Sequence, residues 1–133
     1  MQRRLLVVDD LDDTAVSFAY LLGNLGHLVE FTTHPEAALV IARRFDPEFA
    51  FIDIGMPRID GWQLARLLKS DERTAAIRLV AITGYVRPDD ERKSRDSGFE
   101  AHWRKPVDVA RMEALLADPA PPSTPEAIQP RFL

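Results

Sequence analysis

Two kinds of hydrophobic pattern alternate along the chain. The first is a short apolar run, which is typical of a strand buried on both faces of a sheet. Such runs occur at residues 4–8, 49–54 and 77–83, and residues 27–33 and 99–104 are also predicted to be strands. Between them, apolar spacings of three or four residues and helix-ending residues predict helices at 13–25, 35–45, 61–69, 88–97 and 107–117. This alternation favours an α/β fold with a parallel sheet covered by helices on both faces.

Two of these helices carry more specific expectations. In the helix at 61–69, Leu64, Leu67 and Leu68 are predicted to face inward, and Asp60 is a plausible N-cap. The helix at 88–97 has almost no apolar stripe. We therefore expect it to be short, exposed and loosely held.

The last part of the chain has a different composition. The whole sequence of 133 residues suits one domain, and we place that domain at residues 1–117. Residues 118–133 contain five of the ten prolines. This density of proline predicts a disordered tail or a linker rather than a regular element.

Composition and charge exclude several classes of function. The net charge of −4 argues against a nucleic-acid surface, which is normally basic. The chain has no cysteine, so disulfides, thiol chemistry and cysteine zinc sites are excluded. No apolar run approaches the roughly 20 residues of a membrane span. These features predict a cytoplasmic protein that binds neither membrane nor nucleic acid.

Candidate chemistry lies where the predicted strands end. Asp9 and Asp10 follow the first strand, Asp53 and Thr83 close the third and fourth, and Lys105 follows the fifth. The carboxyl ends of parallel strands share one edge, where ligands of such sheets bind. Carboxylates gathered at this edge repel one another, and a hard cation with oxygen ligands relieves the repulsion. The sequence therefore predicts an Mg²⁺ site.

The same residue types suit phosphoryl chemistry. An ionised carboxylate is able to attack phosphorus, and an ammonium and a hydroxyl are able to hold phosphoryl oxygens. The alternative for Asp9 and Asp10 is that they only cap the first helix or interact with its dipole. Asp12 and Asp13 are predicted to have that structural role.

Four motifs in order make the chain resemble the receiver domain of bacterial two-component response regulators. They are "VVDD" at residues 7–10, "DIGMPRIDG" at 53–61, "AITGY" at 81–85 and "KP" at 105–106. The likeness spans residues 4–117 and is nearest to receiver modules of hybrid sensor histidine kinases or to stand-alone receivers. It implies a flavodoxin-like (βα)5 fold with strand order 2-1-3-4-5.

The resemblance also implies a role for each acidic residue. Asp53 would be the phosphoacceptor. Asp10, Asp53 and the backbone carbonyl of Gly55 would hold Mg²⁺, and Asp9 would assist through water. Such a domain would catalyse its own phosphorylation and dephosphorylation without being a conventional enzyme.

Further roles follow for the last two motifs. Thr83 and Lys105 would hold the phosphoryl group, and the bond from Lys105 to Pro106 would be cis. His102 falls at the position of an often aromatic switch residue, so Thr83 and His102 would form the switch.

The resemblance implies partners as well. A histidine kinase or a histidine phosphotransfer protein would donate the phosphoryl group. The surface formed by residues 88–97, 99–104 and 107–117 would then change and signal to an effector, and it would also allow a homodimer.

Two other functions are weighed against this one. The first is a receiver-like interaction module that is never phosphorylated. The second is a haloacid-dehalogenase-type phosphatase with Asp10 as nucleophile, Asp12 as acid and base, and Thr83 and Lys105 in support. The second alternative lacks a later acidic pair at a strand end and leaves Asp53 without a task.

Overall fold

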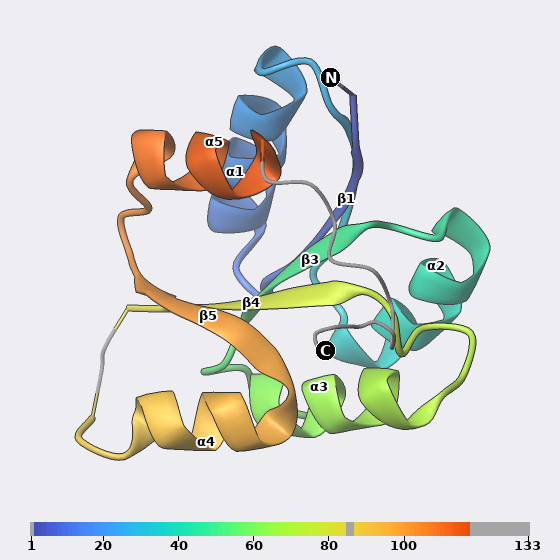
Figure 1. Cartoon of the computed structure of the whole chain (residues 1–133), viewed down its shortest axis with the longest axis vertical. Coiled ribbons are helices and arrows are strands. Elements are labelled where there is room, and N and C mark those ends of the chain that lie inside the picture. Colours follow the sequence, from blue (N-terminus) through green and yellow to red (C-terminus); the bar gives the residue numbers. More distant parts are fainter. Residues whose placement is uncertain (1, 85–86, 118–133) are drawn as a thin grey trace, which may run out of the picture.

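Five parallel strands form one sheet in the order β2-β1-β3-β4-β5, as predicted. The computed structural model describes residues 2–84 and 87–117 (Figure 1). The strands are β1 Arg4–Val8, β2 Leu28–Thr32, β3 Phe49–Asp53, β4 Arg78–Thr83 and β5 Phe99–Arg104. The tail predicted at residues 118–133 lies outside the described residues, so that assignment stays a prediction.

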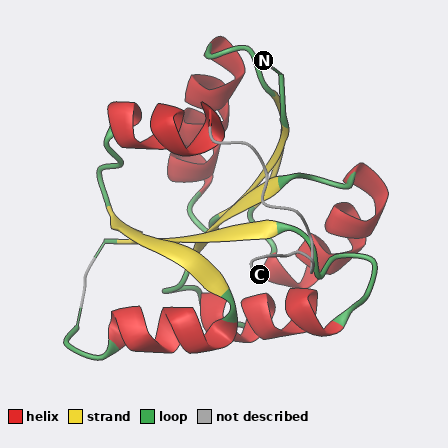
Figure 2. Cartoon of the chain, viewed as in Figure 1, coloured by secondary structure: helices red, strands yellow, loops and turns green. Residues whose placement is uncertain are grey.

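Helices cover both faces of the sheet (Figures 1 and 2). They are α1 Asp12–Asn24, α2 Ala38–Phe45, α3 Gly61–Ser70, α4 Asp90–Ser97 and α5 Val109–Ala117. A 3₁₀ turn, η1 Pro35–Ala37, precedes α2, so the helix predicted from residue 35 is divided in two. α1 and α5 lie on one face, and α2, α3 and α4 lie on the other.

Alternating strand residues supply two separate cores. One core, under α2 and α3, includes Leu6, Val8, Ala50, Ile52, Leu79 and Ala81. The other, under α1 and α5, includes Leu5, Val7, Phe49, Phe51, Val80 and Ile82. All five residues of β3 are buried, which explains why its sequence is an apolar run that ends in a single acid.

Some predictions for the helices were wrong in detail. Leu67 is 46% exposed rather than inward, because the positions of α3 that face the sheet are Gly61, Leu64, Ala65 and Leu68. Asp12 and Asp13 lie in the first turn of α1, but the N-cap position is Leu11, and no side chain caps the helix. They therefore act only through the helix dipole.

The polar fourth helix matches its prediction. The buried residues of α4 are Asp90, Ser94 and Ser97, with no apolar residue among them. This helix is therefore held to the domain by hydrogen bonds and not by an apolar stripe.

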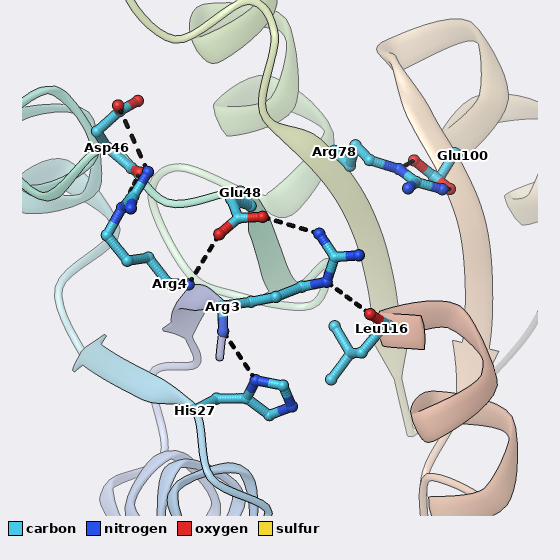
Figure 3. A network of polar contacts seen from close by, with 8 residues as sticks. All are labelled: Arg3, Arg4, His27, Asp46, Glu48, Arg78, Glu100 and Leu116. Carbon is cyan, nitrogen blue, oxygen red and sulfur yellow. Dashed lines mark hydrogen bonds and ion pairs between the residues drawn. The ribbon is translucent and has the colours of Figure 1, made fainter. Parts of the chain in front are cut away.

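A network of polar contacts closes the edge of the sheet opposite the candidate site (Figure 3). The buried guanidinium of Arg3 donates to Glu48 at 2.8 Å and to the carbonyl of Leu116 at 2.5 Å. The Arg3 backbone N–H donates to His27 Nδ1 at 3.1 Å. Arg3 thereby joins the beginnings of β1 and β3 to the end of α5, which fixes the edge away from the site.

The turn into α3 sits directly behind the end of β3. The side chain of Asp60 accepts from the backbone N–H of Gln63, and Gln63 bonds back to the Asp60 N–H, which completes a capping box. Gly61 then passes so close to β3 that a Cβ there would lie 2.5 Å from Ile54 Cα and 2.7 Å from the carbonyl oxygen of Asp53.

We predict opposite effects of alanine at two glycines. Gly61→Ala should lower the free energy of unfolding by about 2 kcal/mol or more, because backbone atoms cannot yield to the new methyl group. Gly23→Ala, in α1 with no atom within 4 Å of the new Cβ, should raise it by about 0.5–1 kcal/mol. Urea unfolding of both variants measures this. Equal stability of the two variants would contradict the close packing at Gly61.

Candidate functional site

The ends of four strands supply the candidate residues. Asp9 follows β1, Asp53 ends β3, Thr83 ends β4 and Lys105 follows β5. Because all four strands are parallel, these positions lie at one edge of the sheet. Thr83 is held in place through its carbonyl, which accepts from the Lys105 N–H at 2.7 Å.

Three carboxylates meet at this edge. One oxygen from each of Asp9, Asp10 and Asp53 lies within 4.8 Å of the others. Asp9 and Asp53 are buried, with 4% and 9% of their surface exposed, whereas Asp10 is half-buried. Asp9 also accepts from the N–H of Leu11 at 3.0 Å, so its side chain orders the turn into α1 as well.

One ammonium group faces this cluster. Lys105 Nζ lies 3.0 Å from Asp9 Oδ2 and 3.4 Å from Asp53 Oδ2. The other oxygen of Asp53, Oδ1, accepts from the N–H of Gly55 at 2.9 Å. Asp53 is therefore oriented by two donors, one on each carboxylate oxygen.

The pKa values of Asp53 and Lys105 are both raised, for different reasons. Burial, with the charge of Asp9, raises the pKa of Asp53, and the Gly55 N–H and Lys105 only partly offset this. Burial alone would lower the pKa of Lys105, but its hydrogen bond to Asp9 and the charges of Asp53 and Asp9 outweigh it, so this pKa is raised. Ionised Asp53 is thus under-compensated in the protein alone.

The donor set fits a hard divalent cation. Three carboxylates offer oxygen ligands within reach of one ion, and Asp10 is open to solvent on one side. Mg²⁺ prefers carboxylate oxygens and keeps some of its waters, so a partly open acidic site suits it. Asp9, Asp10 and Asp53 are the residues that could hold such an ion.

A cleft of about 640 Å³ lies at the acidic residues, where the sequence predicts one, but its apolar extension was not predicted. Asp9, Asp53 and Lys105 line its polar end. The rest is mostly apolar and includes Phe18, Leu21, Phe51, Pro106 and Val107. Its only signal in the sequence was the apolar face of α1, which predicts packing and not a cleft.

Two further predictions concern the bond from Lys105 to Pro106 and the position of His102. The bond between Lys105 and Pro106 is cis. His102, in the middle of β5, pairs in register with Ala81, and its Nδ1 lies 2.7 Å from the hydroxyl of Ser94 on α4. Sequence reasoning missed Ser94, since a lone serine in a polar helix carries no signal.

The family model of the response regulator receiver domain matches residues 5–117. The chain belongs to this family. The receiver domain is 30% identical over 111 residues to the polar-differentiation response regulator DivK of Brucella ovis, covering 84% of this chain and 90% of DivK. The structure resembles the chemotaxis protein CheY4 of Vibrio cholerae, with a TM-score of 0.80 and 18% identity over 88% of this chain and 98% of CheY4.

Another solved relative is a response regulator protein from Burkholderia pseudomallei with a phosphorylated aspartic acid, a calcium ion and citrate. Its TM-score is 0.76 at 24% identity, covering 84% of this receiver domain and 65% of that chain. Family membership leaves the haloacid-dehalogenase alternative without support. Within residues 2–84 and 87–117, no helix has both the length and the apolarity to cross a bilayer.

We predict that Asp53→Asn stabilises this receiver domain when Mg²⁺ is absent. The raised pKa of Asp53 means that the folded protein disfavours its charge, so removing that charge should raise Tm by about 2–4 °C at pH 7. The folded protein keeps the proton to higher pH than the unfolded chain does. The gap between the variant and wild type should therefore shrink as the pH falls through the folded pKa, and vanish below the ordinary value.

Thermal unfolding in EDTA across this pH range measures the effect. Adding Mg²⁺ should raise the Tm of the wild type and change that of Asp53→Asn much less. An Asp53→Asn protein that is less stable than wild type in EDTA would contradict the unfavourable burial of the Asp53 charge.

Proposed function

We propose that this receiver domain accepts a phosphoryl group onto the carboxylate of Asp53 as part of a two-component phosphorelay. One observation carries the proposal. Asp53 is a buried acid at a strand end, beside two further carboxylates and 3.4 Å from the only lysine ammonium of the described site. A helix cap or a surface acid needs none of these neighbours, whereas phosphoryl transfer needs all of them.

The transfer follows from the two oxygens of Asp53. Oδ1 is held by the Gly55 N–H, and Oδ2, on the Lys105 side, attacks phosphorus. A new O–P bond forms while the N–P bond of a phosphohistidine breaks. The imidazole nitrogen of the donor leaves with the bonding electron pair and takes a proton from solvent. The product is an aspartyl phosphate, and later attack by water on phosphorus restores Asp53.

We assign the remaining residues of the site to charge and position. Asp9, Asp10, Asp53 and the carbonyl of Gly55 would hold Mg²⁺, which supplies positive charge for the phosphoryl oxygens. Lys105 exchanges its contact with Asp53 for one with a phosphoryl oxygen, and the Thr83 hydroxyl holds another. The phosphorylated aspartic acid and calcium ion of the Burkholderia pseudomallei relative support the same pairing of an aspartyl phosphate with a divalent cation.

The partners follow from this chemistry. A histidine kinase or histidine phosphotransfer protein in the cytoplasm supplies the phosphoryl group. The surface of α4, β5 and α5 responds through Thr83 and His102, and either an effector or a second copy of the domain binds it. α4 suits a movable element because its buried residues are all polar.

Phosphorylation of the purified domain tests the proposal. With acetyl phosphate and Mg²⁺, the wild type should gain the mass of one phosphoryl group, and Asp53→Asn should gain none. Asp60→Asn is the matched control in the same loop, because asparagine also caps helices well, so this variant should be phosphorylated like wild type. Intact-protein mass spectrometry measures all three.

The result that overturns the proposal is equally definite. If the wild type gains no mass from acetyl phosphate or from a phosphorylated histidine donor, the domain is an interaction module. If Asp53→Asn still gains mass at another acid, Asp53 is not the phosphoacceptor.

A further inference from the structure

One buried hydroxyl on α4, that of Ser94, contacts two neighbouring elements at once. Ser94 is 1% exposed, and its Oγ accepts from Trp62 Nε1 of α3 at 3.0 Å. The same oxygen lies 2.7 Å from Nδ1 of His102 on β5. We call this three-residue contact the Ser94 bridge. It joins α3, α4 and β5. The buried residues of α4 are all polar, so apolar packing of α4 does not hold these elements together.

The chemistry of the three groups fixes the direction of the hydrogen bonds. The indole N–H is a donor only, so Ser94 accepts from Trp62. Burial lowers the pKa of His102 despite the charges of Glu91 and Asp90, so the ring is neutral at pH 7. If Ser94 donates to Nδ1, only the Nε2–H lacks a partner among the described residues. The other tautomer would leave both the serine hydrogen and Nε2 without one, so it is disfavoured.

Both partners of Ser94 are connected to the candidate site. Trp62 is connected to the end of β3, and His102 to the end of β4. Trp62 follows Gly61, whose N–H donates to the Ile54 carbonyl at 3.2 Å. Gly61 passes so close to β3 that a Cβ there would lie 2.7 Å from the Asp53 carbonyl oxygen. A change in the position of the Asp53 backbone therefore reaches Trp62 directly.

The second connection runs through the neighbouring strands. His102 pairs in register with Ala81, and Thr83 lies two residues further along β4 on the same face of the sheet. Ala81 is therefore the residue of this face that neighbours both positions. If Thr83 moves toward a phosphoryl group on Asp53, the imidazole gains room beside Ala81 and is drawn away from Ser94.

We infer that Ser94 is a positioning residue that holds α4 in its unphosphorylated place, and that phosphorylation of Asp53 acts on the α4 surface by breaking the Ser94 bridge. This inference rests on the proposed function. The unpartnered Nε2–H of His102 supports the inference. A buried donor without a partner costs free energy, so the bridged state is only slightly favoured and a modest free energy opens it. Ser94 touches neither phosphate nor metal ligands, so its effect is on the equilibrium between the two states.

The indole N–H of Trp62 reports the bridge in ¹H–¹⁵N spectra. Trp62→Phe assigns its resonance, and Trp103, which packs in the other core, is the internal reference. In wild type without phosphate, the Trp62 indole proton should exchange slowly and resonate downfield. Addition of beryllofluoride and Mg²⁺, which mimic the aspartyl phosphate, should move this resonance upfield and speed its exchange.

Ser94→Ala should place the Trp62 resonance near its upfield position before any addition. It should also raise the affinity for beryllofluoride about three- to tenfold, because activation no longer opens a hydrogen bond. Ser97→Ala is the matched control. Ser97 is also buried on α4 but bonds to Arg66 and to the Lys93 carbonyl, so its loss should leave both readouts unchanged.

Several results would overturn the inference. One is a Trp62 resonance that is the same in Ser94→Ala as in wild type, and another is a beryllofluoride affinity that falls or stays constant. Should Ser94→Ala fail to fold, Trp62→Phe removes the same bond from the other side and must raise the affinity too. If the wild type binds beryllofluoride and the indole resonance of Trp62 does not shift, the inference about the Ser94 bridge is wrong and the proposed function still stands. A wild type that binds none defeats the proposed function, while the unliganded Ser94→Ala comparison still decides whether the bridge exists.

Discussion

The structure depends on electrostatic repulsion at one edge of a parallel sheet. The topology brings the carboxylates of Asp9, Asp10 and Asp53 together, and Lys105 faces them with positive charge. Burial makes this shortage of positive charge costly, as the raised pKa of Asp53 shows. A cation and a phosphoryl group at this edge are therefore linked, since the first supplies the charge that the second requires.

The two edges of the sheet are built differently. At the amino edge, Arg3 ties β1, β3 and α5 together through buried contacts, so this part resists movement. At the carboxyl edge, α4 is held by polar contacts alone. Each hydrogen bond of the Ser94 bridge contributes about 1 kcal/mol, whereas the unpartnered Nε2–H of His102 costs about 1–3 kcal/mol. These opposing contributions nearly cancel, so opening the Ser94 bridge costs little free energy.

The sequence predicts the fold well because its strongest signals are local. Apolar runs identify β1, β3 and β4, and the ends of the predicted strands identify the acidic cluster and Lys105. Leu67 was wrongly predicted to face inward, because the face of α3 that contacts the sheet is narrow and leaves this leucine exposed. Ser94 was missed for another reason: its two partners come from residues 62 and 102, and only tertiary packing brings them to one hydroxyl. Periodicity predicts single elements, so it cannot predict a contact that forms only when several elements pack together.

The central claim is that one bound cation relieves the repulsion among the three carboxylates. A crystal structure of the unphosphorylated domain in Mn²⁺ tests it most directly, since anomalous scattering marks the ion. The account predicts an ion about 2.1–2.3 Å from carboxylate oxygens of both Asp10 and Asp53, at the edge where Lys105 reaches Asp9. The absence of an ion there at millimolar Mn²⁺, or an ion bound without Asp53, would contradict it.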